Sequence, residues 1–177
     1  MGGPGSIGSF LWLWLVMSTA MMLPALVPAA SLATVAGRSS GAFVGAYLAV
    51  WATAGLLAFE AARGVMDGGR WPVAAVVAAA GLYQLSPLKD ACLRRCRAPL
   101  GTLLGRGAIT AGVEHGALCL GCCWALMLAL LALGAASLVW MAVISAVIFV
   151  EKATLVGSRV VAPVGFALIG LAIWMVA

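Results

Sequence analysis

The sequence carries very little charge for its length. Only 8% of its 177 residues are Asp, Glu, Lys or Arg, whereas a soluble domain has about 25%. Hydrophobic residues make up 65% of the chain, and the mean hydropathy is +1.17. This number of charged residues is too small to cover the surface of a soluble domain. The composition therefore predicts an all-α integral membrane protein that is surrounded by the lipid bilayer.

Several motifs that define common functions are also missing. The chain has no P-loop, no Rossmann glycine pattern and no HExxH sequence, and it shows no RNP-like or helix-turn-helix pattern. The net charge of +5 comes from basic residues between apolar runs, where they set topology and contact anionic lipid. We therefore do not expect nucleic acid as a partner. The first residues lack the basic segment of a signal peptide, so the first apolar run is predicted to be a retained span.

The apolar runs predict about six transmembrane helices in one polytopic domain that covers residues 1–177. A bilayer core of about 30 Å needs about 20 helical residues. The predicted spans are 9–28, 40–63, 71–85, 108–133, 137–150 and 160–176. Pro24 should kink or end the first span, and Pro163 is expected in the first turn of the last, where proline is tolerated.

The segment 86–98 is predicted to be an amphipathic helix lying on the membrane surface. Ser86 and Pro87 suit its N-cap and first helical position. A return loop, 99–107, follows it. The inward face would carry Leu88, Ala91, Cys92 and Cys96, and the outward face Lys89, Asp90, Arg94 and Arg97.

The distribution of basic residues predicts which side of the membrane this segment occupies. Six spans put both termini on one side. Of the ten Lys and Arg residues, Arg63 and Arg70 fall on that side and the other eight on the opposite side, which is therefore expected to be cytoplasmic. The cysteines of segment 86–107 would then be cytoplasmic, where thiols stay reduced.

The five cysteines and the single histidine form a compact pattern in the sequence. An odd number of cysteines excludes a complete set of internal disulfides. On an α-helix, four of these residues fall within an arc of about 100° on one face, together with small residues that allow another backbone to approach closely. The four residues are His115, Cys119, Cys122 and Cys123.

Other side chains could add to a site at this face. Met17 and Met21 lie one helical turn apart, with Met22 adjacent, and their thioethers could either bind Cu(I) or fill gaps in the core. Glu114 could be a proton-coupled group or an interface charge. Glu60 most simply pairs with Arg63, three residues later.

Four sequence segments resemble a bacterial family of uncharacterised integral membrane proteins that are predicted to bind metal. The segments are 20–24 (AMMLP), 83–96 (YQLSPLKDACLRRC), 115–124 (HGALCLGCCW) and Glu151-Lys152. The resemblance implies a multi-pass protein of the bacterial cytoplasmic (inner) membrane. It implies no particular metal, substrate or reaction.

The first functional hypothesis is a soft-metal site. Thiolate, thioether and imidazole ligands together favour Cu(I), with Zn²⁺ second. The basic residues of segment 86–98 would favour the thiolate form that binds metal. The function would be transport, sensing or delivery of the ion to a partner membrane protein. The candidate ligands are Cys92, Cys96, His115, Cys119, Cys122 and Cys123, with Met17, Met21, Met22 and Glu114 as possible secondary ligands.

Two alternatives remain open at this stage. The Cys119-x-x-Cys122 pair could perform thiol–disulfide exchange with a membrane quinone, which is the one reading that would make the protein an enzyme. The chain could instead be a non-catalytic subunit of a larger membrane complex or a homo-oligomer, with its cysteines in packing roles.

Overall fold

The computed structural model describes residues 6–67, 69–98, 107–134, 137–154 and 157–177, and within these ranges every element is a helix. The predicted all-α class is therefore confirmed for this part of the chain. The predicted return loop 99–107 lies almost entirely outside it. The helices are α1 (Ile7–Val35), α2 (Ser40–Asp67), α3 (Arg70–Gln84), α4 (Pro87–Arg97), α6 (Ala108–Gly134), α7 (Leu138–Ala153) and α8 (Gly157–Val176).

The described residues do not confirm all six predicted spans. Within the part of the chain that the structure describes, three stretches are long and apolar enough to cross a membrane, namely Ser40–Arg63, Ala108–Leu133 and Gly157–Val176. The number rises to five if each of two bent helix pairs is counted as one span. Helix α7 has only 16 residues, which is short of the roughly 20 that a span needs.

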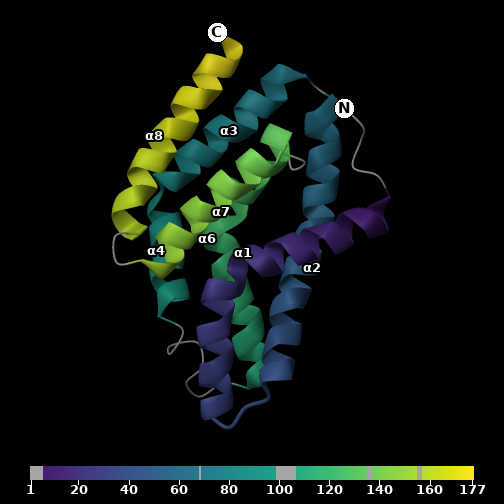
Figure 1. The fold of residues 1–177 in the computed structure, drawn as a ribbon, viewed down its shortest axis with the longest axis vertical. Helices are drawn as coiled ribbons and strands as arrows, with labels where there is room; N and C mark the ends of the chain where they lie inside the picture. Colours follow the sequence, from purple (N-terminus) through teal and green to yellow (C-terminus); the bar gives the residue numbers. More distant parts are fainter. Residues whose placement is uncertain (1–5, 68, 99–106, 135–136, 155–156) are drawn as a thin grey trace.

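Two bends shape the bundle (Figure 1). Helix α1 turns by 75° between its parts Ile7–Met22 and Leu26–Val35, and the predicted break at Pro24 falls between them. Helices α3 and α4 meet at 66°. There Ser86 caps α4 as predicted, because its hydroxyl accepts a hydrogen bond from the backbone N–H of Lys89.

Helices α2 and α6 pack closely because α6 has glycine at the contact. A Cβ atom on Gly112 would lie 2.3 Å from the carbonyl oxygen of Phe43, and one on Gly116 would lie 3.1 Å from Val50. The expectation that small residues on this face of α6 admit another backbone is thus confirmed. A second closely packed pair is formed by α3 and α8, the last helix of the chain, which lie side by side (Figure 1). Gly81 and Gly165 provide that contact.

Replacing Gly112 by alanine should separate α2 from α6. The new methyl group meets backbone atoms, which cannot rotate away, so we expect a loss of about 1–3 kcal/mol. Thermal unfolding in detergent measures the effect. Gly45→Ala on α2 is the control, because nothing lies within 4 Å of its Cβ position, and it should unfold at or slightly above the wild-type temperature. Equal unfolding temperatures for Gly112→Ala and Gly45→Ala would contradict the described packing.

The buried face of α4 differs from the predicted one. Lys89, Leu93 and Cys96 are buried, whereas Leu88 is 61% exposed. Lys89 was placed on the outward face, but its charge is satisfied inside the protein by Glu151 of α7, at 2.7 Å. Pro163 is the seventh residue of α8 rather than part of its first turn, because that helix begins at Gly157, before the predicted residue 160.

Candidate metal centre

The side-chain ammonium group of Lys152 lies among sulfur atoms. Its Nζ is 2.9 Å from the Sγ of Cys119, 3.0 Å from the Sδ of Met22 and 3.8 Å from the Sγ of Cys123. These residues come from α7, α6 and α1. Helices α1 and α6 thus bring sulfur atoms to one cationic group that α7 supplies.

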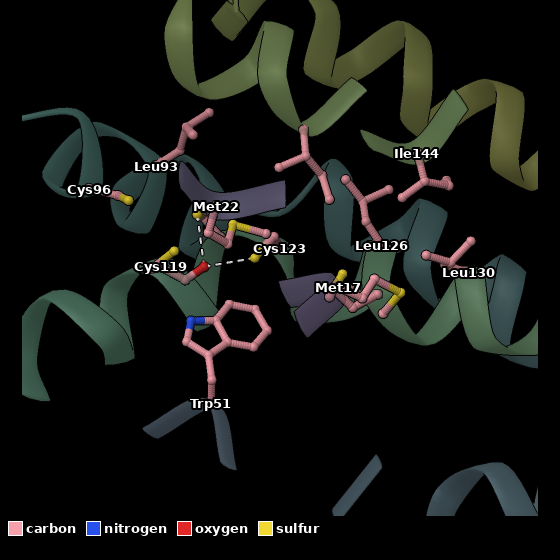
Figure 2. Packing of buried hydrophobic residues seen from close by; sticks show 14 of the residues in the cluster. Met17, Met22, Trp51, Leu93, Cys96, Cys119, Cys123, Leu126, Leu130 and Ile144 are labelled. Atoms are coloured by element: carbon pink, nitrogen blue, oxygen red, sulfur yellow. Dashed lines mark hydrogen bonds between the residues drawn. The ribbon is translucent and has the colours of Figure 1, made fainter. Parts of the chain in front are cut away.

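Further side chains extend this arrangement around Cys119. The phenol of Tyr47, on α2, lies 3.0 Å from the Cys119 sulfur. The thiol of Cys96, near the end of α4, lies close enough to the thiols of Cys119 and Cys122 to interact with them. We call Met22, Cys96, Cys119, Cys122 and Cys123 the sulfur cluster. Figure 2 shows four of its members, Met22, Cys96, Cys119 and Cys123, gathered in one region.

The helices place these residues for simple local reasons. Cys119, Cys122 and Cys123 share one side of α6, and all three are at most 1% exposed, as the predicted helical face requires. Met22 ends the first straight part of α1, and Cys96 lies one residue before the end of α4. The bend of α1 and the start of α4 therefore decide where these two sulfurs lie.

Two thiols of α6 are turned toward their own helix. Those of Cys122 and Cys123 donate hydrogen bonds to the Cys119 carbonyl oxygen at 3.1 and 2.9 Å, and Figure 2 draws the bond from Cys123. All five cysteines are free thiols. Among the described residues, no group of three or more His, Cys, Asp or Glu side chains is arranged to hold a metal ion. Thioether and thiol sulfurs are nonetheless the donors that a soft ion such as Cu(I) prefers.

The remaining candidate ligands lie around the cluster. His115 is fully buried against the rings of Phe43 and Tyr47, at 5.8 and 5.9 Å between centroids. Cys92 is half-buried and packs over Gly121, whose missing side chain leaves room for its sulfur. Glu114 is half-buried on α6.

Of the three candidate methionines, Met22 is the one whose sulfur contacts the cationic group. Met17 belongs to the buried apolar core, and Met21 packs against that core. For these two residues the structure agrees with the core-filling interpretation. Met22 follows Met21 in the sequence and is not part of the pair Met17 and Met21 that lies one helical turn apart. It is completely buried beside Lys152.

Among the basic residues of α4, Arg95 acts electrostatically on Cys92, but three others are held by oxygen acceptors rather than by thiols. Lys89 pairs with Glu151, Arg94 pairs with Asp90 on the surface, and the guanidinium of Arg97 donates to the carbonyl of Thr154. The cation that contacts the thiols of the sulfur cluster is Lys152. The physical reason is that carboxylate and carbonyl oxygens, which accept hydrogen bonds more strongly than sulfur, lie within reach of the α4 side chains.

Sequence reasoning missed two functional candidates, Lys152 and Tyr47. Lys152 belongs to the Glu151-Lys152 pair already noted as a motif, which is the signal that could have drawn attention to it. Tyr47 is one of only two tyrosines in the chain and stands in an apolar stretch, where a phenol needs a hydrogen-bond partner. The other, Tyr83, donates to the carbonyl of Gly121 at 2.5 Å, so it supports α6 beside the cysteines.

A second polar group adjoins the cluster. Glu151 receives hydrogen bonds from the ammonium of Lys89 and from the amide of Gln84, each at 2.7 Å, and Lys89 also donates to Gln84. All three residues are at most 2% exposed. Since Glu151 directly precedes Lys152, this group ties α3 and α4 to the part of α7 that enters the sulfur cluster.

The fold and the cluster together define an apolar, all-helical protein that gathers thioether and thiol groups in its interior. A model of the PpoB2 family, described as a copper chaperone, matches residues 11–175. The chain therefore belongs to this family, and its function is related to copper. No curated protein and no solved structure was found to match it.

Proposed function

We propose that this chain is a membrane-embedded copper chaperone that holds Cu(I) in the sulfur cluster and passes it to a partner protein. The observation that supports the proposal best is the meeting of a thioether and two thiols around one cationic group, at 2.9 to 3.8 Å. A position that accommodates one positive charge among soft donors suits a monovalent soft cation.

In this proposal, Cys119 is the central ligand, with Met22 and Cys123 beside it. The sulfur of Cys119 lies close to Lys152, Tyr47 and Cys96, so it occupies the centre of the cluster. Cys96 and Cys122 complete the set. The presence of a thioether favours copper over zinc, because Zn²⁺ sites in proteins use thiolate, imidazole and carboxylate ligands. His115 and Cys92 would be neighbours of the ion rather than its first ligands.

The membrane location in the proposal is supported by the outer surface. Only 17% of the apolar stretch of α8 and 33% of that of α2 is buried inside the protein. Large apolar side chains are widely exposed, among them Trp12, Leu57, Val139, Phe166 and Trp174 at 66–76%. A soluble monomer rarely exposes so much apolar surface, and hydrocarbon covers it at no cost.

Delivery rather than storage is proposed because the donors are distributed over three helices. Met22, Cys96 and Cys119 belong to α1, α4 and α6, so a shift of one helix changes the ligand set. Met22 also lies at the bend of α1. An ion held this way can be passed to a partner's sulfur ligands one bond at a time.

Metal analysis tests this proposal. Full-length protein in detergent is reduced, exposed anaerobically to equal Cu(I) and Zn²⁺, and freed of unbound metal. We expect about one copper per chain and little zinc, by the preference of thioether and thiol donors for soft ions. Zinc in place of copper, or no bound metal, would contradict the proposal. If the protein takes up no metal but a quinone added afterwards oxidises Cys119 and Cys122 to a disulfide and is itself reduced to the quinol, thiol–disulfide exchange is favoured instead.

A further inference from the structure

Lys152 is an unusual neighbour for a metal-binding cluster. Its Nζ is about 3 Å from two of the sulfurs, at 2.9 Å from Cys119 and 3.0 Å from Met22. The only other lysine, Lys89, is paired with a carboxylate and is fully buried. Lys152 is half-buried, so its side chain borders the outside of the protein while its charged end lies among the sulfurs.

The ammonium group and a bound Cu(I) would compete for the same lone pairs. An ammonium group donates hydrogen bonds to lone pairs on sulfur, and those lone pairs also form the bonds to a metal. A metal–sulfur bond measures about 2.3 Å, so the ion and Nζ would be close neighbours. Two positive charges at such a distance repel strongly in a medium of low dielectric constant.

We propose that Lys152 is a specificity-determining residue whose ammonium occupies the place of the copper ion on Cys119 and Met22, and that Cu(I) binds by displacing it. This inference rests on the proposed function. For a given set of thiolates, exchange of one monovalent cation for another leaves the charge of the cluster unchanged, whereas a divalent ion would add a charge to an apolar interior. When the ion leaves for a partner, the ammonium returns to the same sulfurs.

The proposal predicts how charge at position 152 affects affinity. Lys152→Gln removes the competitor and should tighten Cu(I) binding by about ten-fold or more, because a hydrogen bond to a charged group no longer has to be broken. Transfer of Cu(I) to a chelator should slow by a similar factor. Lys152→Arg keeps the charge and should stay near the wild type. Competition with a colorimetric Cu(I) chelator in detergent measures both quantities.

A second measurement needs no variant and so does not depend on how a variant folds. Lys152 and Lys89 are the two lysines of the chain, so an amine-specific reagent followed by mass spectrometry reports on each separately. Loading with Cu(I) should raise the labelling of Lys152 at least several-fold, whereas Lys89, fully buried in its ion pair, is the internal control.

The outcomes separate this inference from the proposed function. If the wild type binds Cu(I) but Lys152→Gln binds it equally or more weakly, or copper leaves Lys152 labelling unchanged, the displacement is wrong while the copper site stands. Equal tightening in Lys152→Gln and Lys152→Arg would also overturn it, because packing rather than charge would then be responsible. If the wild type binds no Cu(I), both proposals fail.

Discussion

Cys119→Ser is expected to abolish tight binding of Cu(I). Cys119 is fully buried, and its sulfur lies 2.9 Å from Lys152 and 3.0 Å from Tyr47. A serine hydroxyl is a hard, neutral donor that a soft ion does not accept as a substitute. The loss of Cu(I) affinity should exceed the roughly 10- to 100-fold loss that follows removal of a residue that hydrogen-bonds to a metal ligand. Chelator competition and copper content after purification measure it.

Cys92→Ser is the matched control for this prediction. It makes the same chemical change in the same protein, but Cys92 packs over Gly121 and is only half-buried. We expect it to keep wild-type stoichiometry and most of the affinity. Equal losses in both variants would indicate a site centred on α4 rather than on Cys119. Full retention of copper by Cys119→Ser would remove the central ligand from the proposal.

The features that the sequence predicted correctly are local ones. The cysteine-bearing face of α6 follows from helical periodicity, the cap of α4 from Ser86 and Pro87, and the bend of α1 from Pro24. Gly112 could be assigned to a close helix contact because it shares a face with the cysteines. Each of these inferences uses residues that are at most a few turns apart, where the geometry of one helix decides the outcome.

The features that the sequence did not predict depend on contacts between distant segments. Lys89 was placed on the polar face of α4 because an amphipathic pattern sends charges outward, yet its partner Glu151 lies 62 residues later. Lys152 reaches Met22 across 130 residues. Periodicity carries no information on such pairs. The charge pattern therefore did not predict that Lys152 is the cation at the sulfur cluster.

Lys89→Met should cost about 3–5 kcal/mol of stability, because it leaves the carboxylate of Glu151 buried without its ionic partner. The ion pair measures 2.7 Å, and both side chains are at most 2% exposed. Thermal unfolding in detergent measures the loss. Arg63→Gln is the control, since its pair with Glu60 is 3.7 Å long and largely exposed, so screening by solvent should leave little effect.

The double variant Lys89→Met/Glu151→Leu distinguishes a missing partner from a missing side chain. Removing both charges also removes both polar partners of Gln84 but leaves no stranded carboxylate, so most of the lost stability should return. The readout extends to the metal site. Glu151 directly precedes Lys152, so the single variant should also misplace Lys152, and the fraction of Lys152 that an amine reagent labels should rise. A double variant as unstable as the single one would mean that the shape of Lys89, rather than its charge, holds α4 against α7.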